Sequence, residues 1–482
     1  MNNSKIIQIL RTFSKDEMKL LGNFVQSPFF NSSKIMLSMY RTLRKRYPGF
    51  QEKMIDKRKI FQELHEGKKF NEQIYKNNSS EFLKLLKKFL VQLGLKSDGD
   101  IQTRLILNQY NTRFIDSLFK SAMSTYKKEL DLKNNVDELY FDKRFFVEQE
   151  TVQFGLSRNK QHEISENVVN RAGYQILHLY IWLLKSLSEI KTNEFIFNAV
   201  YEPNLPKEFF AQIEKFDILK HSKRLPGFEK SIFEIFYFGV LASYFDDNDE
   251  YYYKFKQLFL ENINKFRFEM SFNFLVRLET SCIHRTQKNK DFSRELFNIY
   301  KLKLKHNMYK FRPGPSFSII NFRNMLVVSL NLNEIKWAQD FVERYYKELP
   351  PEHRQWMYNF SLAKISFEKK DYDKTFQYLN KINLKEFAFK FDLRSLQIKL
   401  FYEVNNIDGV LHEIETYRQF LYKNKNVSEE RRTSFLNFLS LVNELIKIEN
   451  ARSLADLRYK AANTNPLNDR DWLLKKTDSF AL

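Results

Sequence analysis

Apolar residues recur along most of the chain at intervals of three and four, the spacing that places them on one face of an α-helix. Phe82, Leu86 and Phe89 illustrate this spacing. Gly (11) and Pro (10) are scarce among the 482 residues, although the turns of β-rich folds and the loops that bind phosphates depend on them. The pattern therefore predicts an all-α protein.

The predicted helices divide the chain into four parts. A polar stretch at Lys96–Asp100 follows several short helices, and longer helices are expected beyond it, the first over about residues 102–130. Pro203, Pro206 and Pro226 then mark an irregular connection. The expected parts are a basic helical module at 1–98, a helical linker with early hairpins at 101–228, a repeat array at 229–425 and C-terminal capping helices at 426–482.

A turn between two helices recurs in the array as an acidic or polar residue followed by an aromatic residue or Ile. The second residues of successive turns are 41, 43, 37 and 35 positions apart, and the last two intervals approach the 34 residues of a tetratricopeptide repeat. The turns are Glu250-Tyr251, Asp291-Phe292, Glu334-Ile335, Asp371-Tyr372 and Asn406-Ile407.

The helix after each of the last three turns carries inward residues at matching offsets. They are Ala338, Val342 and Tyr345; Thr375, Leu379 and Ile382; and Val410, Ile414 and Tyr417. Together with Pro350, these positions resemble a degenerate tetratricopeptide array over about 319–425, with looser hairpins before it. The resemblance implies an α-solenoid of helical hairpins, closed at its end by helices at about 428–450 and 467–479.

Three short segments also resemble those of uncharacterised helical-repeat proteins of Bacteroidetes-type bacteria. The segments are Phe13–Glu17, Ser27–Asn31 and Trp472–Leu474. This resemblance implies no known activity.

If the tetratricopeptide register holds, the first helix of each unit lines a concave groove. Basic and aromatic residues would alternate there, a combination that suits an acidic peptide or a C-terminal carboxylate. Lys364 and Lys399 are expected at surface positions of this groove. The alternative is that the aromatic residues belong to the core between repeats and the lysines are solvated. The expected groove residues are Arg323, Phe360, Lys364, Phe367, Lys399 and Tyr402.

The net charge of +20 is unevenly distributed. Residues 1–98 contain 20 Lys or Arg and 9 Asp or Glu, which gives +11 from one fifth of the chain. Such an excess suggests contact with nucleic acid phosphates, although a solvated basic surface is the simpler explanation and the one that we favour. The residues expected to share two exposed helix faces are Arg41, Arg44 and Lys45, and Lys84, Lys87 and Lys88.

Motifs for catalysis, metals and cofactors are missing from the sequence. The eight histidines are widely spaced, and no phosphate loop or nucleophile elbow occurs. The single cysteine, Cys282, precedes His284 by two residues, and side chains at that spacing on a helix point in different directions. We therefore expect a protein without metal or cofactor and without enzymatic activity, although distant carboxylates could still meet in the fold.

We predict a cytoplasmic protein without a membrane span. The single cysteine excludes an internal disulfide, and the N-terminal apolar run is too short for a signal peptide. The longest uncharged apolar stretch, at about residues 172–184, is too short to cross a bilayer. The first hypothesis is a scaffold that binds a protein or peptide through the array. The second is a nucleic-acid-associated protein that uses the basic module, and an enzyme is the least favoured.

Overall fold

The computed structural model contains 24 α-helices and no strand among the residues it describes. Two compact units are present, one formed by residues 1–132 and 140–175 and the other by 133–139 and 176–482. The chain changes units between residues 132 and 133, between 139 and 140, and again between 175 and 176, inside the long helix at Ser165–Phe197. The described residues are 4–51, 55–132, 136–197, 199–213, 215–245, 247–286, 289, 291–310, 316–382, 387–424, 427, 429–448 and 450–479.

Five helices of the first unit enclose its main core. Ser14 caps the second of them in a capping box with Glu17, each side chain bonding the other residue's backbone N–H. The Tyr40 hydroxyl donates to the Met18 carbonyl at 2.8 Å, and its ring lies so close to Gly22 that a β-carbon there would clash. The helices are α1 (Lys5–Thr12), α2 (Lys15–Gln26), α3 (Lys34–Arg44), α4 (Lys57–Leu64) and α5 (Glu72–Ser97).

The helix expected over residues 102–130 is two helices, so that expectation was wrong. The chain turns at Phe114, which has the left-handed φ of 56°, and the Ile115 N–H donates to the Tyr110 carbonyl. The second part of the unit contains α6 (Gly99–Thr112), α7 (Asp116–Leu130), α8 (Tyr140–Leu156), the 3₁₀ turn η2 (Gln161–Glu163) and the start of α9 (Ser165–Phe197).

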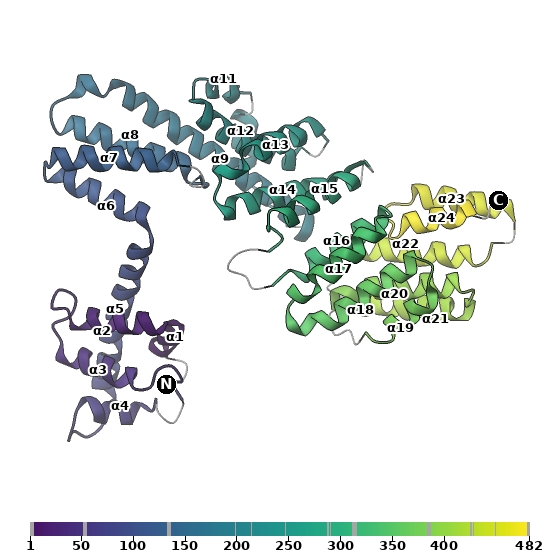
Figure 1. Ribbon diagram of the computed structural model, residues 1–482, viewed down its shortest axis with the longest axis horizontal. Coiled ribbons are helices and arrows are strands. Elements are labelled where there is room, and N and C mark those ends of the chain that lie inside the picture. Colours follow the sequence, from purple (N-terminus) through teal and green to yellow (C-terminus); the bar gives the residue numbers. More distant parts are fainter. Residues whose placement is uncertain are drawn as a thin grey trace. The chain divides into compact units, whose positions relative to one another are not determined.

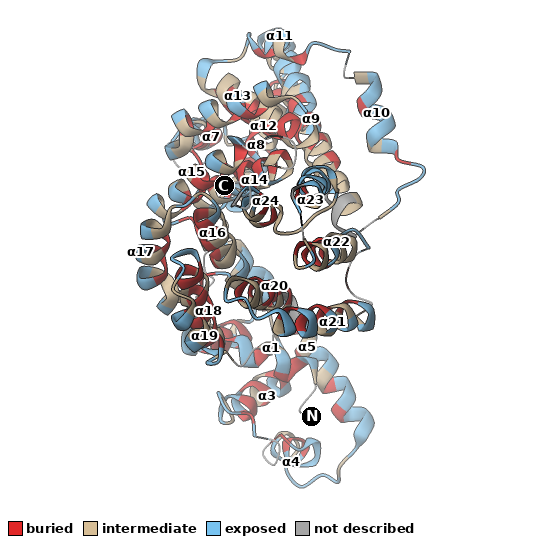
Figure 2. Ribbon diagram, turned by 90° about the vertical axis from the view of Figure 1, so that its right-hand side faces the viewer, coloured by how far each residue is buried: buried red, intermediate tan, exposed pale blue. Residues whose placement is uncertain are grey.

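The second unit is built mainly of helical hairpins that follow one another along the chain (Figure 1). Buried and exposed positions alternate around these helices, as expected for amphipathic helices packed on their neighbours (Figure 2). After α9 come α10 (Leu205–Ile213), α11 (Ile218–Ser222), α12 (Gly227–Tyr244), α13 (Asp249–Asn262), η3 (Ile263–Lys265), α14 (Phe268–Thr286), α15 (Asp291–Lys305), α16 (Ile319–Asn331), α17 (Ile335–Tyr345), η4 (Tyr346–Glu348), α18 (Pro351–Glu368), α19 (Tyr372–Leu379), α20 (Phe387–Glu403), α21 (Ile407–Lys423), α22 (Glu429–Leu445), α23 (Ala451–Asn463) and α24 (Arg470–Ser479).

The turns inside the last three hairpins have the same backbone geometry. Asn333, Lys370 and Asn405 have left-handed φ values of 60°, 62° and 57°. In each turn the next residue caps the second helix, and its N–H donates at 2.9 Å to the carbonyl five residues earlier. These capping residues are Glu334, Asp371 and Asn406, so the predicted turn positions are confirmed.

The inward positions predicted for the second helices are also buried. Ala338, Thr375 and Val410 occupy the first matching offset, and Val342, Leu379 and Ile414 occupy the second. At the third offset Tyr417 is buried, whereas Tyr345 and Ile382 are half-buried.

Candidate functional site

The predicted groove residues lie on α16, α18 and α20, the first helices of three successive hairpins. The Arg323 guanidinium forms an ion pair with the Asp392 carboxylate, with Nε 2.9 Å from Oδ2. The Lys399 ammonium lies 2.6 Å from Oδ1 of Asp469. Burial and the neighbouring Lys399 charge lower the pKa of Lys364 to about 8, whereas Asp392 and Asp469 act to raise it. The fold therefore brings the three predicted cations into one electrostatic neighbourhood.

The expectation that Lys399 is a surface residue was wrong. Its side chain is 6% exposed because Asp469, 70 positions later in the chain, covers it and pairs with it. Phe360 and Phe367 are 1% and 7% exposed, so these two aromatic residues belong to the core and not to a groove surface.

Tyr402 is half-buried because the C-terminal helix α24 packs on α20. The Trp472 ring lies 5.4 Å from the Tyr402 ring, and its indole N–H donates to Glu403 at 2.9 Å. Lys476 donates to the same carboxylate at 2.6 Å. The chain's own C-terminal segment therefore covers part of the predicted groove.

Lys364 differs from its neighbours because its ammonium forms no hydrogen bond or ion pair within the described residues. Lys364 belongs to a set of six charged residues that we call the central charge cluster, with four cations and two carboxylates. An excess of positive charge remains after the two ion pairs are counted. The cluster consists of Arg323, Lys364, Asp392, Lys399, Arg431 and Asp469.

The same charges act on Asp392. Burial raises the pKa of this carboxyl, but Arg323, Lys364 and Arg431 together hold it below its usual value. Asp392 is therefore ionised at neutral pH, and its charge is already engaged by Arg323.

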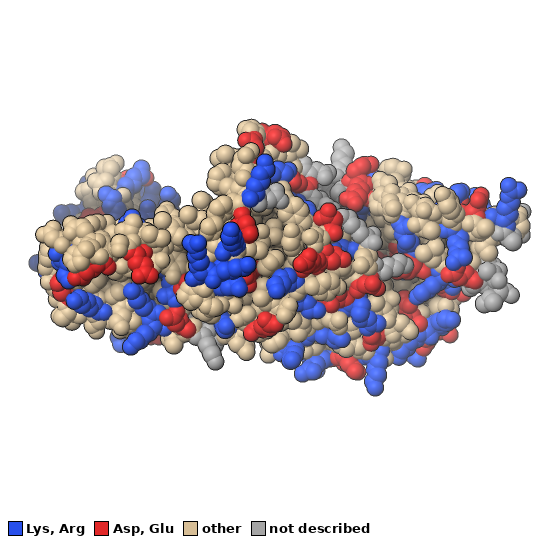
Figure 3. Space-filling model, turned by 90° about the horizontal axis from the view of Figure 1, so that it is seen from above, with Lys and Arg blue, Asp and Glu red and all other residues tan. Residues whose placement is uncertain are grey.

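The basic residues predicted in the first unit are exposed, as expected. None of the six forms a side-chain hydrogen bond or an ion pair within the described residues. Arg46, in contrast, pairs with Glu63 and is largely covered. The six residues are Arg41, Arg44 and Lys45 at the end of α3, and Lys84, Lys87 and Lys88 on α5. Over the face of the molecule seen in Figure 3, acidic and basic side chains intermingle.

Cys282 is a structural residue buried in the second unit. Its thiol is 0% exposed and donates to the Tyr252 hydroxyl at 3.0 Å, and burial raises its pKa to about 12. The Tyr252 hydroxyl in turn donates to Glu295 at 2.8 Å. His284 takes no part in this chain of hydrogen bonds and lines a cavity instead. Cys282 therefore lacks the thiolate character of a nucleophile.

Among the described residues, no three His, Cys, Asp or Glu side chains are placed to hold a metal ion. In that same part of the chain, no helix has both the length and the apolar character required to cross a membrane.

Among the described residues the protein is all-helical and made largely of consecutive hairpins, and a group of interacting charges joins the first helices α16, α18 and α20 to residues of the C-terminal segment. No protein-family model, curated protein or solved structure matches the chain.

Proposed function

We propose that this chain is a non-enzymatic, cytoplasmic scaffold that binds an acidic protein segment through the central charge cluster. The observation that carries the proposal is the half-buried Lys364 ammonium, which lies near the cations Arg323 and Lys399. It is 5.6 Å from the centre of the Phe360 ring and forms no hydrogen bond or ion pair within the described residues. Burying a charge is costly unless it is paired. A carboxylate of a partner at this position would supply the missing counter-charge.

The proposal includes an α-solenoid of tetratricopeptide-like hairpins over residues 319–425. The three turns of identical geometry at Glu334, Asp371 and Asn406 support this arrangement, as do their spacings of 37 and 35 residues. Stacked units of this kind bring their first helices side by side. Arg323 and Lys364 come from two such helices, which is why one partner segment would meet both, whereas Lys399, covered by Asp469, adds only its charge.

The test begins with capture of partners from the native host by the full-length chain, with and without nuclease. Lys364→Met keeps the length of the side chain and removes its charge, whereas Lys399→Glu would break a buried ion pair and confuse binding with unfolding. Lys336→Met is the matched control, because Lys336 is exposed and unpaired on the second helix α17. We expect the Lys364 variant to lose the partner and the Lys336 variant to retain it.

Binding of the recovered partner should weaken as the pH rises above about 8, the pKa of Lys364 in the free protein. A carboxylate binds only the protonated amine and raises its pKa, so the dissociation constant should rise up to about tenfold per pH unit above that value. Titration of the wild type between pH 7 and 9.5 measures this dependence, and Lys364→Met should not show it. An affinity equal in the wild type and the Lys364 variant would reject the groove assignment.

The second candidate function is contact with nucleic acid through the exposed basic residues of the first unit. Six unpaired cations on α3 and α5 favour it, because each phosphate contact releases a counterion. We expect the full chain to bind DNA or RNA weakly and with little sequence preference, since phosphate contacts do not read bases.

Replacing Arg41, Arg44 and Lys45 with Ala should reduce the slope of log affinity against log salt by up to ~3 units on duplex DNA. Fluorescence anisotropy at several salt concentrations measures the slope. The control replaces Lys254, Lys336 and Lys447 with Ala, which removes the same charge from exposed, unpaired positions elsewhere. Equal slopes for the two triple variants, or no binding at micromolar protein in low salt, would exclude this function.

A further inference from the structure

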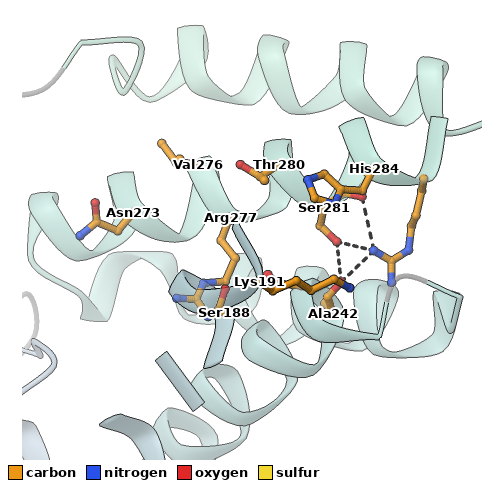
Figure 4. Close-up of a pocket in the computed structure, with 11 residues that line it drawn as sticks. Ser188, Lys191, Ala242, Asn273, Val276, Arg277, Thr280, Ser281 and His284 are labelled. Atoms are coloured by element: carbon orange, nitrogen blue, oxygen red, sulfur yellow. Dashed lines mark hydrogen bonds between the residues drawn. The ribbon is translucent and has the colours of Figure 1, made fainter. Parts of the chain in front are cut away.

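A cavity of about 250 Å³ lies in the second unit, between the end of α9, the end of α12 and one face of α14 (Figure 4). It is separate from the central charge cluster, which involves α16, α18 and α20. Ser188 and Lys191 come from α9, and Ala242 and Ser243 from α12. Helix α14 contributes the remaining lining residues: Asn273, Val276, Arg277, Thr280, Ser281, His284 and Arg285.

The lining is basic and hydroxyl-rich. It includes Lys191, Arg277 and Arg285, together with His284, and no described Asp or Glu lines the cavity. Such a surface favours an anion on charge alone.

Arg285 supplies fixed charge to the cavity but has few donors to spare. Its Nη1 donates to the Ala242 carbonyl at 2.8 Å, and its Nη2 to the Phe245 and Asn248 carbonyls at 3.0 and 2.9 Å. Its Nε forms an ion pair with Asp249 at 3.1 Å. These bonds hold the guanidinium in place at one end of the cavity.

Arg277 has free donors. Its guanidinium forms no hydrogen bond and no ion pair within the described residues. Burial lowers its pKa to about 10, and the charges of Glu189 and Glu138 only partly offset that effect. Glu138 is engaged elsewhere, by Lys185 at 2.6 Å. At pH 7 the guanidinium therefore remains charged and lacks a counter-ion in contact with it.

Two neighbouring side chains on the same face of α14 have unused donors as well. Asn273 lies one turn before Arg277 and Thr280 lies one turn after it, and neither side chain forms a hydrogen bond within the described residues. An amide, a guanidinium and a hydroxyl thus come from successive turns of α14 and line the cavity; all three are labelled in Figure 4. Asn273 is exposed and Arg277 and Thr280 are half-buried, so an anion from solvent can reach these donors.

We propose that this cavity binds a small phosphate-type oxyanion, either inorganic phosphate or a small phosphate monoester, with Arg277 as its principal ligand. Guanidinium groups form paired, charge-assisted hydrogen bonds with phosphate oxygens, and hydroxyl and amide donors complete such sites. The volume of about 250 Å³ lies below the ~300–1,000 Å³ of pockets for drug-sized ligands, which favours a small anion.

The test titrates the full-length protein with sodium phosphate, with sodium chloride as the ionic-strength control, and follows binding by calorimetry and by ³¹P line broadening. Arg277→Gln removes the charge and retains a polar side chain. Lys254→Gln is the control, since Lys254 is exposed, forms no hydrogen bond or ion pair within the described residues and is not among the lining residues. We expect saturable binding by the wild type and the control, and at least tenfold weaker binding by Arg277→Gln.

Thr280→Val provides a second variant of similar shape in case the first fails to fold, and it should weaken phosphate binding severalfold. Glycerol 1-phosphate is titrated in parallel. If the protein binds it more tightly than inorganic phosphate, the site is for a phosphate monoester; if it binds it more weakly, the site is for the free ion. Either result supports the proposal. Absence of saturable binding by the wild type would overturn it, as would unchanged binding in both cavity variants. Neither outcome depends on whether the charge cluster binds a partner.

Discussion

Replacing Arg285 with Met is expected to destabilise the second unit by about 3–5 kcal/mol, the usual cost of breaking a buried charged contact. The side chain is 1% exposed and joins α14 to the turn between α12 and α13 through the carbonyls of Ala242, Phe245 and Asn248. Met fills most of the space, but it removes the Arg285 donors from these acceptors, and each buried acceptor that loses its partner costs about 1–3 kcal/mol. The Ala242 carbonyl still accepts from the Ser281 hydroxyl at 2.8 Å, so the main loss is at Phe245 and Asn248.

The effect is measured by the rate at which a thiol reagent labels Cys282. The chain has two units, so a single unfolding midpoint does not report on one of them, whereas the labelling rate reports on the region around Cys282. The thiol is fully buried on α14, three residues before Arg285, so it reacts only when this region opens. The free energy of opening, which is calculated from the rate of Cys282 modification, should fall by about 3–5 kcal/mol in the Arg285 variant. Arg294→Met is the control: Arg294 pairs with Glu334 at the surface, so its loss should cost less than about 1 kcal/mol. Similar effects of the two variants would show that the Arg285 contacts contribute little.

In a separate variant, replacing Lys303 alone with Met is expected to lower the free energy of unfolding of the second unit by about 3–5 kcal/mol as well. Lys303 on α15 is 0% exposed and forms an ion pair with Glu279 on α14, which is itself buried. The single variant leaves the Glu279 carboxylate buried without its counter-charge. The double variant Lys303→Met with Glu279→Leu removes both charges, and it should recover most of the lost stability.

Urea unfolding followed by circular dichroism and by Cys282 labelling compares the wild type, the two single variants and the double variant. These four proteins form a double-mutant cycle, and its coupling energy separates the contribution of the ion pair from the other effects of the two substitutions. A double variant as unstable as the sum of the two single variants would contradict the expectation, because it would show that the two charges do not compensate each other.

The sequence determined the helical class, most helix ends and the turns of the repeats. These features depend on interactions between residues a few positions apart. Ser14 and Glu17 form their capping box within one turn, and Asp371 caps α19 through the Lys374 N–H. Apolar spacing likewise located the buried positions of α17, α19 and α21. The turn at Phe114 was missed because it contains no Gly, Pro or Asn, the residues that usually mark a left-handed position.

The sequence identified Arg323, Lys364 and Lys399 from their places in the repeat register, but it could not assign their partners. Asp392 and Asp469 pair with Arg323 and Lys399 across 69 and 70 positions, and no local pattern encodes such distances. The same limit applies to the burial of Lys303 and Arg285, which look like solvated cations in the sequence.

Only the tertiary structure decided which charges are paired and which are not. Helix packing brings carboxylates or carbonyls from distant segments to Arg285, Lys303 and Lys399, whereas Lys364 and Arg277 receive none within the described residues. Helix formation depends on short-range spacing and capping, so the sequence determines it directly. The pairing of buried charges depends on where whole helices lie, and packing left the half-buried cations Lys364 and Arg277, at two of the candidate binding sites, without an ion pair within the described residues.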